Sequence, residues 1–210
     1  MLTQNPAGLY AITDCSTNST TDLLKKSELI LNTGIALFQY RNKTEDKTQK
    51  KELALQLQAL CQRYKTPFIV NDDLDLAASI DADGIHLGKN DIDISTARKS
   101  IGKKIIGVSC YNDIERAIVA EKCGADYVAF GSFFPSATKP DAVKADVELI
   151  IHSKNKLNIP VVAIGGITPE NGKELIKAKV DYLAVINGLY SANETVIATQ
   201  RYKNLFKNYV

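Results

Sequence analysis

Short apolar runs alternate along the whole chain with longer segments in which apolar residues recur every three or four positions. The short runs are rich in Ile, Val, Leu and Tyr and often follow Gly or Pro, a pattern typical of strands that are buried on both faces. We expect strands at 8–13, 36–40, 67–70, 84–87, 104–108, 126–130, 160–164 and 182–186.

The segments between these runs carry helical signals. In 46–64, Leu53, Leu57 and Leu60 recur at a spacing that places them on one face of a helix. Thr168, followed by Pro and Glu, predicts another helix start, because Thr caps well, Pro suits the first turn and an acid favours the positive end of the helix dipole. Further helices are predicted at 21–32, 113–123 and 193–207.

Eight strand–helix units in 210 residues, about 26 residues each, predict an α/β protein with one domain over residues 1–210. Buried strands of this kind favour a parallel sheet, and eight units can close into a single (β/α)8 TIM barrel. An open, doubly wound sheet is the alternative, although the Gly-x-Gly-x-x-Gly fingerprint of its dinucleotide-binding form is missing. In a barrel the active site lies where the strands end.

Composition narrows the class of protein. A hydrophobic share of 45% is ordinary for a globular domain, and a net charge of +2 is too small to predict a nucleic-acid partner. We expect no signal peptide and no membrane span, because no apolar run approaches the roughly 20 residues that a span needs. Cys15, Cys61, Cys110 and Cys123 form no Cys-x-x-Cys pair, which favours reduced thiols and a cytoplasmic location. The sequence leaves open whether the chain forms a homo-oligomer.

The stretch 131–139, Gly-Ser-Phe-Phe-Pro-Ser-Ala-Thr-Lys, follows the predicted sixth strand and is the most informative part of the chain. Its hydroxyls and backbone amides donate hydrogen bonds and Lys139 adds positive charge, which together suit a phosphate. A polar surface loop is the plainer interpretation. Polar chemistry at the other strand ends favours the phosphate site.

The second predicted strand ends with Gln39, Arg41 and Lys43 at alternate positions, so the strand period places them on one face. Two cations and an amide facing the same way suit a polyanion such as diphosphate. The competing interpretation is a solvated, charged start of the next helix. Ser109, after the fifth strand, either bonds a substrate or caps a helix, and no base accompanies it for a Ser nucleophile.

Two acidic strand ends predict a metal site. Asp72 and Asp91 follow neighbouring strands, and oxygen ligands of this kind favour Mg²⁺, which often takes one or two carboxylates. Helix capping is the alternative, and Asp73 and Asp75 fit it better than Asp72 does. His86 lies inside an apolar strand, which indicates a hydrogen-bonded core histidine rather than a base or a ligand.

The seventh and eighth strands end in a second phosphate signal. Gly165 and Gly166 precede the predicted helix start at Thr168, where exposed backbone amides and the helix dipole suit a phosphomonoester. Phosphate binding by the loops after strands seven and eight recurs in barrels, and here the eighth strand leads into Ile186 and Asn187. The sequence therefore predicts two anionic subsites, one for diphosphate with Mg²⁺ and one for a single phosphate.

Together these motifs closely resemble those of thiamine-phosphate synthases, and they follow the family's order over nearly the whole chain. They are Gln39-Tyr40-Arg41-x-Lys43, Asn71-Asp72-Asp73, Gly84-Ile85-His86-Leu87-Gly88 with Asp91, Gly107-Val108-Ser109, Gly131-x-x-x-Pro135-Ser136-x-Thr138-Lys139 and Gly165-Gly166-Ile167. The resemblance implies a (β/α)8 barrel that joins 4-amino-5-hydroxymethyl-2-methylpyrimidine diphosphate to 4-methyl-5-(2-phosphoethyl)thiazole. It implies a dissociative substitution, assisted by one Mg²⁺, that yields thiamine monophosphate and diphosphate.

The resemblance also assigns residues by matching motif. Those implied to hold the pyrimidine diphosphate are Gln39, Tyr40, Arg41, Asn42, Lys43, Asn71, Ser109 and Lys139, with Arg41, Ser109 and Lys139 as the catalytic residues. Those implied to hold the thiazole phosphate are Ser136, Ala137, Thr138, one or both of Gly165 and Gly166, Ile186 and Asn187. Asp72 and Asp91 are implied to bind Mg²⁺.

Some positions depart from the family pattern. Lys89 and Asn90 stand where many members have Gln-Glu, and Tyr111 stands where many have His. Ser136 keeps the hydroxyl of a common Thr, and Asn187 replaces a small hydroxyl residue.

Three other functions compete with the synthase. A thiazole tautomerase on the same barrel would use a histidine at position 111 and an eroded diphosphate clamp. A non-catalytic binder of thiamine phosphate would not need Asp72 and Asp91. A phosphosugar isomerase would share only the paired glycines. The intact clamp and carboxylates favour the synthase.

Overall fold

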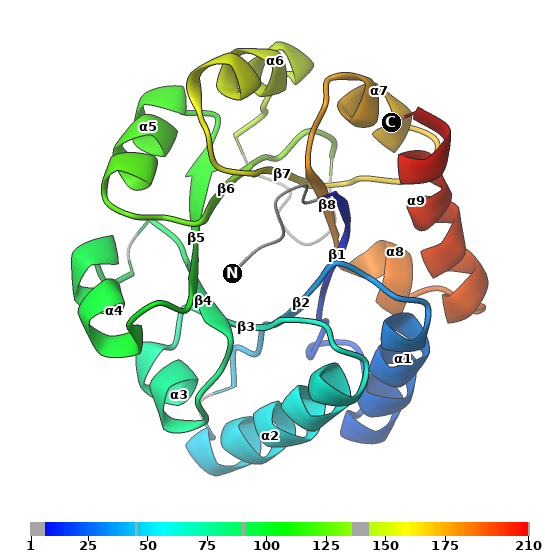
Figure 1. Cartoon of the computed structure of the whole chain (residues 1–210). Helices are drawn as coiled ribbons and strands as arrows, with labels where there is room; N and C mark the ends of the chain where they lie inside the picture. The colour runs from blue at the N-terminus through cyan, green and yellow to red at the C-terminus, as the bar shows by residue number, and fades with distance from the viewer. Residues whose placement is uncertain (1–6, 45, 90, 136–142, 210) are drawn as a thin grey trace.

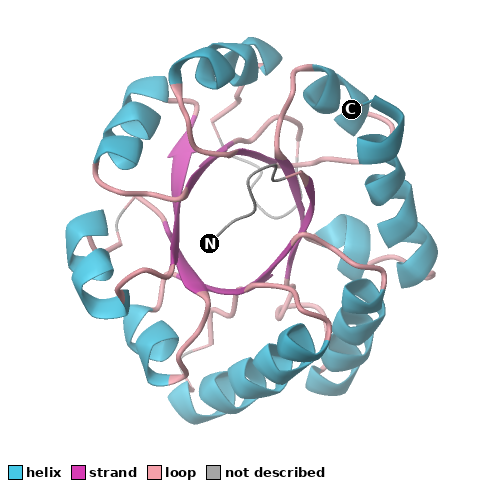
Figure 2. Ribbon diagram, viewed as in Figure 1, coloured by secondary structure: helices cyan, strands magenta, loops and turns pink. Residues whose placement is uncertain are grey.

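The computed structural model describes residues 7–44, 46–89, 91–135 and 143–209. Its strands run parallel, pair in chain order, and close through the pairing of the last strand with the first. Viewed down the axis, the strands form a ring inside an outer ring of helices (Figures 1 and 2). The predicted (β/α)8 TIM barrel is therefore confirmed, and the open-sheet alternative is wrong.

The strands follow the predicted order with small shifts at their ends. The strands are β1 Gly8–Ile12, β2 Leu37–Tyr40, β3 Phe68–Asn71, β4 Gly84–Leu87, β5 Ile105–Tyr111, β6 Tyr127–Phe130, β7 Val161–Ile164 and β8 Tyr182–Val185. The helices are α1 Thr20–Asn32, α2 Lys47–Arg63, α3 Leu74–Ser79, α4 Ile94–Ile101, α5 Ile114–Lys122, α6 Val147–Lys156, α7 Gly172–Lys177, α8 Asn187–Tyr190 and α9 Thr195–Tyr209.

Aspartate side chains start several of the helices. Asp46, Asp73, Asp93 and Asp113 each accept a hydrogen bond from a backbone amide in the first turn of α2, α3, α4 and α5. Asp73 is thus a cap, as the sequence favoured, whereas Asp75 lies within the first turn of α3. Each such bond satisfies an amide that has no partner within its helix, so the caps mark where each βα loop ends.

Two separate apolar layers follow from the alternation of side chains along each strand. One layer fills the barrel interior, and its larger members include Tyr10, Tyr127 and Tyr182. The other, larger layer packs between the strands and the helices. Inward residues near the carboxyl ends of the strands therefore face a common space above the interior layer.

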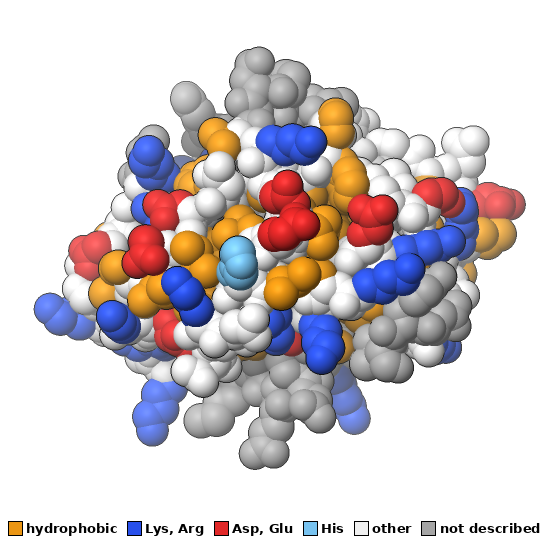
Figure 3. Space-filling model, turned by 90° about the horizontal axis from the view of Figure 1, so that it is seen from above, with side chains coloured by type: hydrophobic (Ala, Val, Ile, Leu, Met, Phe, Trp, Pro, Cys, Tyr) orange, Lys and Arg blue, Asp and Glu red, His pale blue; other side chains and the backbone are white. Residues whose placement is uncertain are grey.

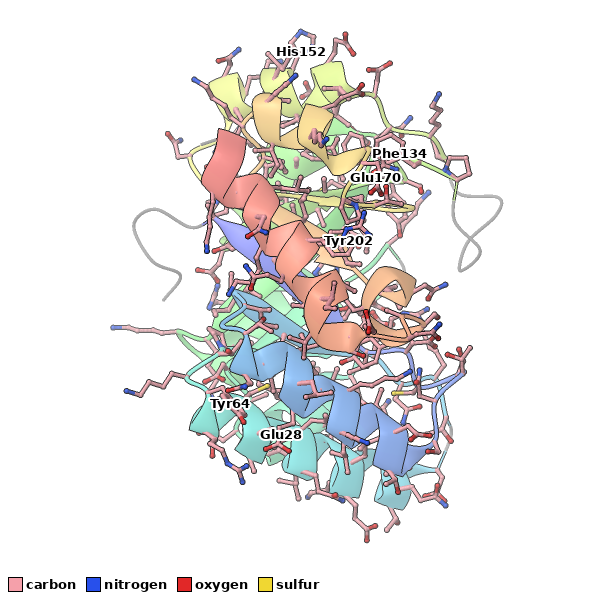
Figure 4. All side chains as sticks on the ribbon, turned by 90° about the vertical axis from the view of Figure 1, so that its right-hand side faces the viewer. Glu28, Tyr64, Phe134, His152, Glu170 and Tyr202 are labelled. Atoms are coloured by element: carbon pink, nitrogen blue, oxygen red, sulfur yellow. The ribbon has the colours of Figure 1, made fainter. Side chains whose placement is uncertain are left out.

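The helix layer is also tied together by polar contacts. Glu28 on α1 accepts hydrogen bonds from Arg63 at 2.8 Å and from the Tyr64 hydroxyl at 3.4 Å, which joins α1 to α2 (Figure 4). The face on the α6 side carries charges of both signs between small apolar groups (Figure 3). Among the described residues, no helix is both long and apolar enough to span a membrane.

The structure corrects the helix start predicted at Thr168. The Thr168 hydroxyl accepts the amides of Glu170 and Asn171, both at 3.3 Å, as a cap would. These residues nevertheless form a turn, and α7 begins only at Gly172. Capping chemistry closes a single turn as readily as it opens a helix, which is why the sequence pattern misplaced the start.

Candidate active site

A cavity of about 770 Å³ opens where the strands end. The predicted site residues that line it are Gln39, Arg41, Lys43, Asn71, Asp72, Asp91, Ser109, Gly165, Gly166, Ile186 and Asn187. They come from the ends of β2, β3, β4, β5, β7 and β8 and meet only through closure of the barrel. The cavity therefore lies where the barrel rule predicts an active site.

Gln39, Arg41 and Lys43 line the cavity together, as strand alternation predicted. Thr13, which directly follows β1, holds the backbone of Arg41 at both polar groups. Its hydroxyl accepts from the Arg41 amide at 2.8 Å and donates to the Arg41 carbonyl at 3.1 Å. The sequence pattern gives no sign of this contact, because Thr13 and Arg41 are adjacent only across the β1–β2 pair.

Tyr40 and Asn42, which the resemblance assigned to the pyrimidine diphosphate, do not line the cavity. The Tyr40 ring is 1% exposed and packs outward, where its hydroxyl donates to the Lys50 carbonyl on α2 at 3.0 Å. The Asn42 amide donates to that same hydroxyl at 2.9 Å. Alternation turns these two side chains away from the side that Gln39 and Arg41 occupy, and their assignment to the diphosphate subsite stays a prediction without support from the cavity lining.

Asp72 and Asp91 face each other across the ends of β3 and β4, within hydrogen-bonding reach. Partial burial and the neighbouring Asp72 carboxylate raise the pKa of Asp91 above its usual value. Burial also opposes the ionisation of Asp72, but the Lys43 ammonium, 2.5 Å away, lowers the pKa of that carboxyl overall. Two carboxylates this close repel each other when both are ionised, so a cation between them would be stabilised.

Local geometry fixes both carboxylates. Asp72 has a φ of 64°, an uncommon value for a residue other than Gly, and its amide bonds the His86 carbonyl at 2.9 Å. Asp91 accepts the Gly88 amide at 2.6 Å. Within the described ranges, no cluster of three or more His, Cys, Asp or Glu side chains could hold a metal ion. The two carboxylates match what Mg²⁺ takes when water and phosphate supply the other ligands.

The paired glycines form a tight cradle after β7. Gly165 has a φ of 105° and Gly166 a φ of 59°, values that glycine adopts without steric cost. A Cβ on Gly165 would lie 2.0 Å from the Ser132 hydroxyl oxygen. The buried Tyr202 of α9, labelled in Figure 4, donates to the Ile167 carbonyl at 3.0 Å and supports this loop from behind.

Ser109 and His86 lie side by side on the cavity wall. The imidazole Nε2 is 2.8 Å from the Ser109 hydroxyl, and Nδ1 is 3.0 Å from the Tyr127 hydroxyl. His86 is 8% exposed, so the expected hydrogen-bonded core histidine also borders the cavity. Its contact with Ser109 went unforeseen, although both side chains occupy inward positions of paired strands, β4 and β5.

Several assigned residues lie outside the described part of the chain. They are Ser136, Ala137, Thr138 and Lys139 of the predicted phosphate loop, together with the departing residue Asn90. Ser132 and Pro135, which precede them, line the cavity. The described part of this loop therefore begins on the cavity wall.

The comparisons with known proteins agree with this geometry. A family model described as thiamine monophosphate synthase matches residues 9–189. The chain belongs to this family. It is 47% identical over 203 residues to a thiamine-phosphate synthase of Nitrosococcus oceani, covering 96% of this chain and 94% of that protein. The one from Methylobacillus flagellatus is 48% identical over 200 residues, covering 95% of each.

A solved structure, the thiamine phosphate pyrophosphorylase from Pyrococcus furiosus, superposes with a TM-score of 0.88 at 33% identity, covering 99% of this chain and 98% of the other. A KGPDC from Streptococcus mutans shares the fold at 16% identity, with a TM-score of 0.77 over 97% of this chain and 98% of the other. The resemblance found in the sequence motifs is thus confirmed, and with it the assignment to thiamine-phosphate synthases, which are transferases.

Proposed function

We propose that the chain condenses 4-amino-5-hydroxymethyl-2-methylpyrimidine diphosphate with 4-methyl-5-(2-phosphoethyl)thiazole to give thiamine monophosphate and diphosphate. One observation carries the proposal. A single cavity brings the cationic side chains of Arg41 and Lys43 beside the carboxylates of Asp72 and Asp91, and the glycine cradle after β7 lines the same cavity. This arrangement suits one substrate with a diphosphate and another with a single phosphate.

Mg²⁺ fits the site proposed for it. Asp72 and Asp91 are oxygen ligands within reach of each other, and burial together with the neighbouring Asp72 carboxylate raises the pKa of Asp91. Bound there, Mg²⁺ would stabilise the charge of a departing diphosphate. Asp72 also orients Lys43 through their 2.5 Å contact, so the ammonium is held next to the same subsite.

Arg41 and Lys43 would stabilise the leaving group. The bond between the pyrimidine methylene carbon and the diphosphate oxygen breaks, and its electron pair leaves with the diphosphate. Arg41, Lys43 and the Ser109 hydroxyl all face the cavity where this charge develops. Arg41 is placed by Thr13 through two backbone bonds, so its side chain starts from a fixed point.

The second substrate completes the reaction. The thiazole nitrogen supplies the electron pair for the new carbon–nitrogen bond, so no proton has to move. Gly165 and Gly166 would hold its phosphate through backbone amides. Ile12, Val162 and Ile164 give the cavity an apolar floor, which limits the access of water to the reactive carbon.

A direct assay tests the proposal. Purified protein receives both substrates with and without Mg²⁺, and thiamine monophosphate and diphosphate are followed together. The expected result is equal formation of both products, dependent on Mg²⁺. Absence of product with the thiazole phosphate still bound would instead support the tautomerase or a binding protein, and would direct attention to Tyr111, whose hydroxyl accepts the Lys89 amide at 3.2 Å.

A further inference from the structure

A series of hydrogen bonds crosses the barrel interior along the wall of the cavity. The Gln39 amide nitrogen donates to the Tyr10 hydroxyl at 2.8 Å, and this hydroxyl lies 2.7 Å from the Tyr127 hydroxyl. Tyr127 then meets His86 Nδ1 at 3.0 Å, and His86 Nε2 meets the Ser109 hydroxyl at 2.8 Å. Five strands contribute one side chain each, and all of these side chains except that of Tyr127 line the cavity.

Three side chains of this hydrogen-bonded series are buried. Tyr10 is 1% exposed, Tyr127 0% and Gln39 2%. Burial raises the pKa of both tyrosine hydroxyls well above the usual value, so both keep their protons. A buried hydroxyl with two partners is fully satisfied only when it accepts from one and donates to the other.

This rule sets the direction of the protons. Because Gln39 donates to Tyr10, Tyr10 donates to Tyr127, and Tyr127 in turn donates to His86 Nδ1. An imidazole that accepts at Nδ1 carries its proton on Nε2, which donates to the Ser109 oxygen. The Ser109 hydroxyl proton is thereby left for an acceptor in the cavity.

Packing holds the middle of the series in place. The Tyr127 ring stacks on His86 with 5.6 Å between centroids and meets the edge of Tyr10 at 5.9 Å. Gly107 gives the ring its space, since a Cβ there would lie 1.9 Å from the ring carbon that bears the hydroxyl. The donor and acceptor atoms are therefore fixed by close-packed neighbours.

We propose that Tyr10, Tyr127 and His86 are positioning residues that fix the Ser109 hydroxyl as a donor to an oxygen of the substrate diphosphate. This inference rests on the proposed function, because it assigns Ser109 to the diphosphate subsite. His86 acts through Ser109, by donating from Nε2 to the hydroxyl oxygen. The tyrosines act through His86 by fixing which ring nitrogen carries the proton.

A double-mutant cycle tests the proposal. The variants are His86→Leu, Ser109→Ala, their combination, and Tyr127→Phe, which breaks the series while keeping the ring. The readouts are kcat, KM for each substrate, and binding of inorganic diphosphate with Mg²⁺ by calorimetry. Tyr182→Phe is the matched control, since Tyr182 belongs to the same interior layer but takes no part in the hydrogen bonds that join Gln39 to Ser109.

We expect the losses of kcat in the two single variants not to add up in the double variant. His86→Leu and Ser109→Ala each lower kcat by roughly 10- to 100-fold, the effect of one hydrogen bond to a charged group, and the double variant loses no more than Ser109→Ala. Diphosphate binding weakens in the same pattern, while KM for the thiazole phosphate stays unchanged. Tyr127→Phe lowers kcat in the same direction, because His86 then loses the donor that fixes its tautomer.

A conservative variant separates positioning from packing. His86→Gln carries an amide nitrogen near the Nε2 position, so it restores a donor to Ser109 and recovers more kcat than His86→Leu at a similar melting temperature. Additive losses in the double variant, normal kcat in Tyr127→Phe, or equal losses in Tyr182→Phe would each overturn the proposal. Failure of wild-type protein to form thiamine monophosphate would instead refute the proposed function.

Discussion

The glycine cradle allows a prediction whose size follows from the geometry. In Gly166→Ala, the new Cβ would lie 2.2 Å from the Pro135 carbonyl oxygen and 2.7 Å from that of Phe134. Both are backbone atoms, so neither can rotate away and the loop has to move. The φ of 59° adds about 1–2 kcal/mol for a residue with a Cβ, and overpacking adds about 1–3 kcal/mol.

Gly124→Ala supplies the matched control. Gly124 also has a left-handed φ, 93°, but a Cβ there has nothing within 4 Å, so this variant carries the backbone cost alone. At roughly 2–4 °C per kcal/mol for a chain of this size, Gly166→Ala should melt about 2–12 °C below Gly124→Ala. Its KM for the thiazole phosphate should rise about tenfold or more, because the cradle amides are displaced.

Thermal melts and steady-state kinetics on the two alanine variants check this reasoning. The kinetics should show a selective effect, with KM for the pyrimidine diphosphate close to that of the wild type in both variants. Equal melting temperatures together with an unchanged KM for the thiazole phosphate in Gly166→Ala would refute the assignment of this loop as a cradle.

Four further predictions concern the same cavity. Mg²⁺ at 100 times its Kd should stabilise the wild type by about 2.7 kcal/mol in thermal melts, and Asp91→Asn should abolish this shift; an undiminished shift would exclude Asp91 as a ligand. Arg41→Ala should weaken the pyrimidine diphosphate far more than the thiazole phosphate in binding titrations, and equal weakening would contradict two subsites. Thr13→Val should lower kcat in the same direction as Arg41→Ala but less, since it frees only the Arg41 backbone. Tyr202→Phe should cost about 1 kcal/mol in denaturant unfolding and raise KM for the thiazole phosphate alone.

The strand ends show which side-chain orientations the sequence pattern predicted correctly. Alternation correctly placed Gln39, Arg41 and Lys43 on one face, because a strand repeats every two residues whatever surrounds it. The same rule, applied to Tyr40 and Asn42, would have excluded them from the cavity, and only the motif resemblance included them. Local periodicity was the more reliable guide to which side chains face the cavity.

The sequence pattern could not predict contacts between residues on strands that are distant in the chain. His86 was expected to be a hydrogen-bonded core residue, which it is, but its partners Tyr127 and Ser109 lie 41 and 23 positions away. Nothing in the spacing of those residues shows that the barrel stacks one tyrosine on the imidazole. The hydrogen bonds between the Thr13 hydroxyl and the Arg41 backbone could not be predicted for the same reason, since they depend on the β1–β2 pairing.

The sequence by itself determined the alternation of strands and helices, the family, and the residue types at each strand end, because these depend on local periodicity and ordered motifs. Only the tertiary structure decided which side chains meet. Closure of the barrel brings Asp72 to Asp91 and joins Gln39 to Ser109 through three buried side chains. Distances of a few ångströms between such residues follow from strand register and packing, which no single segment of the chain encodes.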